Sequence, residues 1–178
     1  MTDEAEPLDT GHRPMPPLHA ADEREMLEAM LDWYRAGVVA KVSGVPQDVA
    51  TATPLRSPTS IAGLVKHLAL VEDSWFAGRL AGLDEAPWYA EVDWEADRDW
   101  EFHTAVNEPI ADQVALYEAA CSRCREIAAG RDLDEIGADT SRQAFTLRFV
   151  YLHLIEETAR HLGHLDVLRE LLDGTTGE

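Results

Sequence analysis

Apolar residues recur at spacings of three and four in four separate stretches of the chain, and this pattern predicts four amphipathic helices. The predicted helices cover residues 22–42, 60–81, 109–129 and 144–172. Gly130 and Gly174 follow the third and fourth helices, where glycine commonly ends a helix. No stretch has the alternating pattern of a strand. The chain is therefore predicted to be all-α, with a four-helix bundle as its architecture.

Two segments depart from this helical pattern. Residues 1–20 are rich in proline and acidic residues and predict a flexible N-terminal tail, which leaves residues 21–174 as one bundle domain. Residues 83–107, between the second and third helices, form a long aromatic-rich loop. Its aromatic and histidine residues are Trp88, Tyr89, Trp94, Trp100, Phe102 and His103. Such a loop could wall a substrate pocket or simply cover the end of the bundle, and both interpretations stay open.

Charge and cysteine content narrow the function classes. The chain has a net charge of −19, from 15 Lys+Arg against 34 Asp+Glu, which excludes nucleic acid and anionic membranes as expected partners. Without a signal pattern or a membrane-length apolar run, a cytoplasmic location is expected. Cys121 and Cys124 fall in the apolar stripe of the third helix, so core packing is expected of them. Asp97, Asp99 and Glu101 are interpreted as a solvated acidic run.

Glu157 and His161, on the last predicted helix, carry candidate chemistry. They lie four residues apart, so both side chains leave the same face, and that face is the apolar one. The neighbouring Glu156 should face water. A carboxylate aimed into a core is costly unless it is paired or binds a metal. A metal ion would compensate Glu157, and an internal ion pair with protonated His161 would serve equally well.

His67 supplies a third candidate ligand, because it projects from the apolar face of the second predicted helix. His67, Glu157 and His161 would place two imidazoles and one carboxylate on two facing helices, as bundle metal sites commonly do. A core histidine with a hydrogen-bond partner is the simpler alternative for His67. His153 and His164 lie at the edge of the stripe and are interpreted as supporting or surface residues.

Three stretches of sequence carry a resemblance to a known family. The last helix reads HLIEETARHLGHLDVLRELLDG from His153 to Gly174, residues 59–76 read TSIAGLVKHLALVEDSWF, and residues 26–35 read MLEAMLDWYR. Together they resemble the DinB-like superfamily, and most closely its actinobacterial mycothiol-transferase-like branch. The resemblance extends over about residues 22–174. It implies a four-helix bundle that holds a divalent metal near one end.

The resemblance also implies the ligand set and the reaction. The family's metal ligands correspond here to His67, Glu157 and His161. Many DinB-like proteins have His at the position of Glu157, whereas the similar thiol-dependent maleylpyruvate isomerases have Glu there. The implied activity is transfer of a low-molecular-weight thiol, such as mycothiol, to a small electrophile, by a bundle that pairs into a homodimer.

The residues themselves do not choose the metal or the reaction. Two imidazoles and a carboxylate suit Zn²⁺ and also accept Ni²⁺, Fe²⁺ or Mn²⁺. A non-catalytic metal-binding stress or regulatory bundle and a metal-dependent hydrolase remain alternatives to a thiol S-transferase. No basic residue is distinguished as a contact for a substrate carboxylate. The arginines considered are Arg56, Arg79, Arg142 and Arg148.

Overall fold

The computed structural model describes residues 15–16 and 22–177, and within them regular structure is helical apart from one isolated β-bridge. Its elements are α1 (Glu23–Val42), α2 (Gln47–Thr51), α3 (Ile61–Asp73), η1 (Ser74–Leu80), α4 (Trp100–Ala105), α5 (Ile110–Ala128) and α6 (Leu147–Asp173). The all-α prediction is confirmed, and the long helices lie where the apolar periodicity predicted them. The predicted tail, residues 1–20, lies outside the described residues except for residues 15–16.

Capping side chains define where several helices begin. Asp22 Oδ1 accepts the amide of Glu25 at 2.9 Å before α1, and Ser60 Oγ accepts the amide of Gly63 at 3.0 Å before α3. Each bond satisfies a backbone donor that has no partner inside its helix. At the other end of the chain, α6 stops at Gly174, whose φ of 74° is a left-handed conformation that favours glycine.

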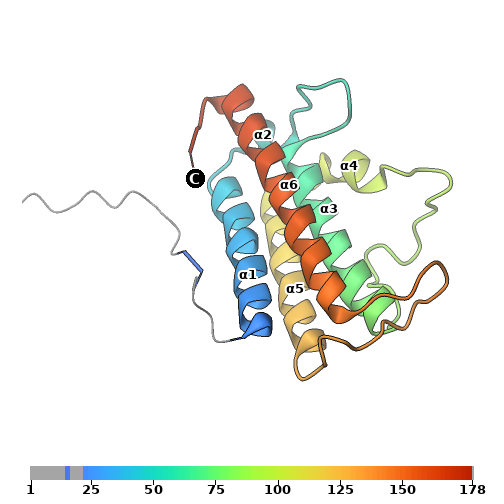
Figure 1. Ribbon diagram of the computed structural model, residues 1–178. Coiled ribbons are helices and arrows are strands. Elements are labelled where there is room, and N and C mark those ends of the chain that lie inside the picture. Colours follow the sequence, from blue (N-terminus) through green and yellow to red (C-terminus); the bar gives the residue numbers. More distant parts are fainter. Residues whose placement is uncertain (1–14, 17–21, 178) are drawn as a thin grey trace, which may run out of the picture.

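Helices α1 and α6 run side by side in the same direction (Figure 1). Near their starts, Arg148 pairs with Glu23 at 2.8 Å. Near their ends, Lys41 pairs with Asp166 at 2.5 Å. Since equivalent ends meet, the two helices are parallel, and α1 enters the bundle at the end from which α6 also begins.

Helices α3 and α5 form the second parallel pair, and α3 is antiparallel to α6 (Figure 1). Lys66 in α3 binds Glu108, just before α5, at 2.8 Å, and Asp73 at the end of α3 binds Arg123 at 2.6 Å. Because the two helices point the same way, residues 81–109 must return along the length of the bundle. This crossover brings α4 against α3.

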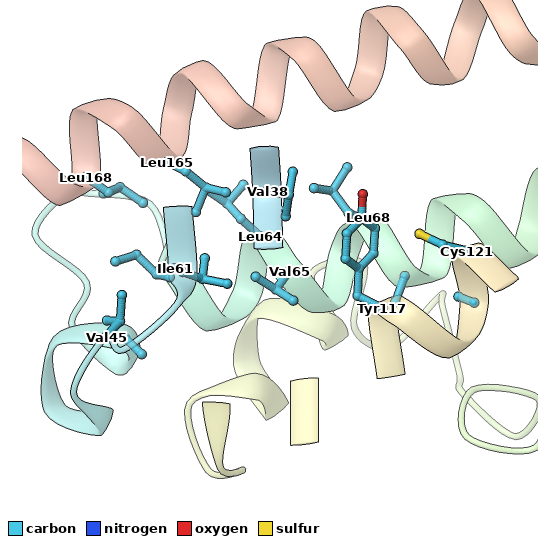
Figure 2. Close-up of a cluster of buried hydrophobic side chains, with 14 residues drawn as sticks. Val38, Val45, Ile61, Leu64, Val65, Leu68, Tyr117, Cys121, Leu165 and Leu168 are labelled. Carbon is cyan, nitrogen blue, oxygen red and sulfur yellow. The ribbon is translucent and has the colours of Figure 1, made fainter. Parts of the chain in front are cut away.

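The core consists of two clusters of buried side chains between the four long helices. The cluster in Figure 2 joins α1, α3, α5 and α6 through residues that include Val38, Leu64, Leu68, Tyr117 and Leu165. The second cluster includes Leu31, Phe76, Cys124, Leu147 and Leu154. Within the described ranges, none of the helices combines the length and apolar character needed to cross a membrane.

The last part of the second predicted helix is a π-helix, η1, instead of an α-helix. The amide of Ala81 bonds to the carbonyl of Phe76, five residues back. The loop before α6 stabilises this wider turn: the amides of Asp139 and Ala138 donate to the carbonyls of Arg79 and Leu80 at 2.9 and 3.0 Å. Helical periodicity in the sequence does not indicate contacts with a loop from another segment, so the π turn was not predicted. The short helices α2 and α4 were also missed.

Candidate metal centre

The structure brings His67, Glu157 and His161 together on the facing sides of α3 and α6. Nε2 of His161 lies 3.2 Å from Oε1 of Glu157, and Nε2 of His67 lies 3.6 Å from the same oxygen. One nitrogen or oxygen atom of each residue lies within 4.8 Å of the others. The side chains are 21%, 14% and 13% exposed, respectively, so the cluster is lined by protein yet reachable from solvent.

Each histidine points one ring nitrogen into this cluster and holds the other with a neighbour. Nδ1 of His67 lies 2.8 Å from Oε1 of Glu101, and Nδ1 of His161 lies 3.2 Å from Nδ1 of His164. An ionised carboxylate can only accept, so a bond to it favours the tautomer of His67 that carries the proton on Nδ1 and leaves the Nε2 lone pair for a metal. Protein metal ligands commonly show this arrangement, with the outer nitrogen hydrogen-bonded and the inner one free to coordinate.

The charges around Glu157 favour its ionised form. Burial alone would raise the pKa of Glu157, but His161, Arg160 and His67 outweigh burial and hold that pKa below its usual value. Arg160 approaches the second carboxylate oxygen, Oε2, at 3.3 Å. Glu157 therefore presents Oε1 to the two histidines as an anionic donor.

The surroundings of His161 favour its neutral form. Burial, together with the neighbouring His67, lowers the pKa of His161, and its contact with Glu157 only partly offsets this. A neutral imidazole beside an ionised carboxylate is the protonation state that a divalent cation requires of its ligands. The ion pair considered from the sequence needs His161 protonated, and the lowered pKa of His161 works against it.

Glu101 is the contact that sequence reasoning missed, and its placement in a solvated acidic run is wrong. Glu101 is only 5% exposed, while Asp99 is exposed and Asp97 pairs with His103. Oε2 of Glu101 is also buried and has no hydrogen-bond partner among the described residues. Because α4 has six residues, it is too short to give a readable period, and the acidic neighbours of Glu101 suggested exposure.

The aromatic-rich crossover contributes one ring directly to the site. Phe102 stacks on His67 with ring centroids 5.5 Å apart and an interplanar angle of 29°. The three tryptophans of the crossover instead pack on one another, with Trp100 6.2 Å from Trp88 and 6.0 Å from Trp94. Lys66 lies over the Trp100 ring at 4.3 Å. The crossover therefore covers α3 with its tryptophans and reaches the metal centre through α4.

The remaining histidines of the described chain lie outside the ligand cluster. His164 is exposed and contacts only the outer side of His161 in this cluster, as a supporting residue should. His153 is half-buried and packs on Trp75 with ring centroids 4.4 Å apart. His103 is exposed and pairs with Asp97 at 3.0 Å. His12 and His19 fall outside the described residues.

Comparison with known proteins identifies the family of this chain. Residues 26–174 match the family described as Mycothiol-S-transferase, a span that contains all three clustered residues and Glu101. No curated protein matches the chain. Since the family match covers most of the sequence, the chain belongs to the mycothiol S-transferase family, within the actinobacterial DinB-like branch.

Proposed function

We propose that this protein is a divalent-metal-dependent S-transferase that joins a mycothiol-like thiol to a small electrophile. The observation that carries the proposal is the convergence of His67, His161 and Glu157, each with one donor atom within 4.8 Å of the others, in a chain of this family. These three residues would hold the metal, and three protein ligands leave positions open for a small molecule.

The donor set suits Zn²⁺ and also accepts Ni²⁺, Fe²⁺ or Mn²⁺. A bound cation of this kind lowers the pKa of a thiol or water that it coordinates, which makes a nucleophile available at neutral pH.

The chain's own residues prepare the site. Glu101 holds the proton of His67 on Nδ1, and Phe102 covers one face of the same imidazole. Arg160 supports Glu157 from its outer oxygen. Because these contacts come from α4 and α6, the three donor atoms are oriented before any ligand arrives, which reduces the cost of binding.

Mass spectrometry of the thiol adduct tests the proposal. Protein loaded with Zn²⁺ is incubated with mycothiol and a chloromethyl-bearing electrophile, and the S-alkylated thiol is quantified against a protein-free reaction. The expected result is metal-dependent adduct formation that His161→Ala abolishes and that the exposed-site control His103→Ala retains. Metal binding without any adduct would contradict the transferase and favour a non-catalytic bundle.

A hydrolase on the same site predicts a different product. It would release the electrophile's hydroxyl form in the absence of thiol, whereas a transferase needs thiol for turnover. Measuring both products in one reaction separates the two. The cytoplasmic location, the homodimer and the exclusion of nucleic-acid and membrane partners stay predictions from the sequence.

A further inference from the structure

Two rows of side chains at four-residue spacing meet where α3 and η1 pack against α6. We name this junction the α3–α6 seam. One row is His67, Val71, Trp75 and Arg79, and the other is Phe149, His153, Glu157 and His161. The rows are joined by ring contacts, with centroids 4.8 Å apart for His67 and His161 and 4.4 Å apart for Trp75 and His153. The metal centre occupies one part of the seam, and aromatic side chains occupy the next.

A cavity of about 460 Å³ opens where the seam reaches the loop before α6. Its lining includes Trp75, Arg79, Arg142, Phe145 and Phe149. This volume is in the range of small-molecule sites, and three aromatic walls with two guanidinium groups give the usual mixture of apolar surface and a few polar anchors. The mechanism proposed above uses none of these side chains.

The loop that closes this cavity is fastened to η1. Backbone bonds from Ala138 and Asp139 hold it against the end of the π-helix, and the amide of Gly137 donates to the carbonyl of Phe145 at 2.9 Å. A Cβ at Gly137 would lie only 2.4 Å from Cζ of Phe145, so glycine is needed for this ring to pack where it does. Both the loop and η1 lie at the lower end of the bundle in Figure 1.

Two aromatic rings position the guanidinium group of Arg79. Its Cζ lies 3.9 Å from the ring centroid of Trp75 and 5.4 Å from that of Phe145, and its nearest acidic partner, Asp139, is 3.5 Å away. Stacking holds the guanidinium plane and leaves N–H donors along its edge, a geometry that matches a carboxylate.

Arg142, like Arg56 and Arg98, has no acidic partner among the described residues. It is exposed and has no ion pair or hydrogen bond within the part of the chain that the structure describes. Most other described arginines are paired with an acid in this protein of net charge −19. The paired ones include Arg24, Arg35, Arg123, Arg125, Arg131, Arg148, Arg160 and Arg169. An unpaired cation beside the stacked Arg79 is a local exception to the acidic surface and favours an anionic ligand.

We propose that the cavity binds a small aromatic carboxylate, whose flat apolar body lies against Trp75 and Phe149. Arg79 and Arg142 would hold its carboxylate group. Phe149 and Glu157 are eight residues apart on α6, about 12 Å along the axis, and His153, which packs on Trp75, lies between them. The cavity is therefore a binding site separate from the metal centre, and the proposal does not rest on the S-transferase function.

Binding of an unreactive carboxylate tests the cavity without the reaction. The probe is 4-methylbenzoate, and its uncharged match is 4-methylbenzamide, titrated into metal-free protein by calorimetry. We expect 4-methylbenzoate to bind with Kd at least about tenfold lower than the amide, since a charge-assisted hydrogen bond contributes that much. Arg142→Gln should weaken 4-methylbenzoate by about tenfold for the same reason. The control Arg98→Gln, at another exposed arginine, should leave the Kd of 4-methylbenzoate unchanged.

Arg79→Gln loses the stacking on Trp75 and can fold poorly for that reason. Arg142 lies on an exposed loop, so Arg142→Gln tests the anion site independently of Arg79. Equal binding of acid and amide, or wild-type affinity in Arg142→Gln, would overturn the proposal. So would the absence of saturable binding to the wild-type protein.

Discussion

Nδ1 of His67 and Oε1 of Glu101 lie 2.8 Å apart, which connects the candidate metal centre to a residue 34 positions away in the sequence. The bond sets the tautomer of His67 and aims its Nε2 at Glu157. Glu101 is nearly fully buried, and its other oxygen has no hydrogen-bond partner among the described residues. A buried carboxylate with a single hydrogen bond is costly, and support of a cationic centre gives that cost a physical reason.

Replacing Glu101 by Gln should weaken Zn²⁺ binding by about 10- to 100-fold, the usual effect of losing an outer-shell partner of a ligand histidine. The amide still accepts from His67 but no longer increases the basicity of the imidazole. The dissociation constant is measured by competition with a chromophoric chelator.

The matched control is Glu95→Gln, an exposed acid on the same crossover. It should leave Zn²⁺ affinity unchanged. The metal-free Glu101→Gln protein should unfold at the same or a higher urea concentration, because a buried charge has been removed. Wild-type Zn²⁺ affinity in Glu101→Gln would show that this residue does not support the metal.

Zn²⁺ at about 100 times its dissociation constant should stabilise the wild-type protein by roughly 2.7 kcal/mol and raise Tm by roughly 5–10 °C. His67→Ala and His161→Ala should each lose this shift and the bound metal, measured by thermal unfolding and elemental analysis. His103→Ala should keep both. Full metal content in His67→Ala would remove His67 from the ligand set.

Gly63 sits where α3 meets α4. A Cβ there would lie 2.5 Å from Cδ1 of Phe102 and 3.3 Å from its Cα, so the clash involves backbone and cannot be relieved by a rotamer change alone. Gly63→Ala should cost about 1–3 kcal/mol in urea unfolding, and it should also weaken Zn²⁺ binding, because Glu101 moves with Phe102.

Gly163 in α6 provides the comparison. A Cβ at this position meets no atom within 4 Å. Gly163→Ala should therefore stabilise the protein by up to about 1 kcal/mol through helix propensity, with Zn²⁺ affinity unchanged. Equal stability of the two variants would contradict the packing assigned to Gly63.

Arg35 and Glu72 form a buried two-bond ion pair between α1 and α3, at 2.7 and 2.5 Å. Glu72 is fully buried, so Arg35→Met leaves a charge without its partner and should cost about 3–5 kcal/mol in urea unfolding. The double variant Arg35→Leu with Glu72→Leu should lose less than the single one. A larger loss in the double variant would indicate that packing volume, not charge, dominates this site.

His103 and Asp97 should titrate as a pair. The hydrogen bond that His103 donates to Asp97 raises the pKa of exposed His103 above 6.5 and lowers that of Asp97 below 3.8. The contribution of His103 to folding stability is therefore complete below pH 6.5 and is lost as the pH rises through its higher folded pKa. The contribution of Asp97 to folding stability is present above pH 3.8 and is lost as the pH falls through its lower folded pKa. NMR titration of His103 should show a pKa that returns toward 6.5 in Asp97→Asn; an unchanged value would exclude the pair.

Local sequence determined the four long helices and the pairing of Glu157 with His161. Helical periodicity reports which face of a segment is buried, and residues four apart share that face whatever surrounds them. Cys121 and Cys124 were correctly placed in the core for the same reason, and burial raises the pKa of the Cys121 thiol to about 12. The apolar face of the second predicted helix indicated His67 in the same way, and the family resemblance then implied that all three residues are metal ligands.

Tertiary structure decided everything that joins segments distant in the sequence. Glu101 reaches His67 only because the crossover folds α4 onto α3, and Arg79 stacks on Trp75 only because η1 widens against the loop before α6. Neither contact produces a periodic pattern in the sequence, because α4 is short and the π turn depends on backbone hydrogen bonds from another segment. The sequence therefore indicated a ligand set, while its supporting carboxylate and the arginine-lined cavity beside it became visible only through packing.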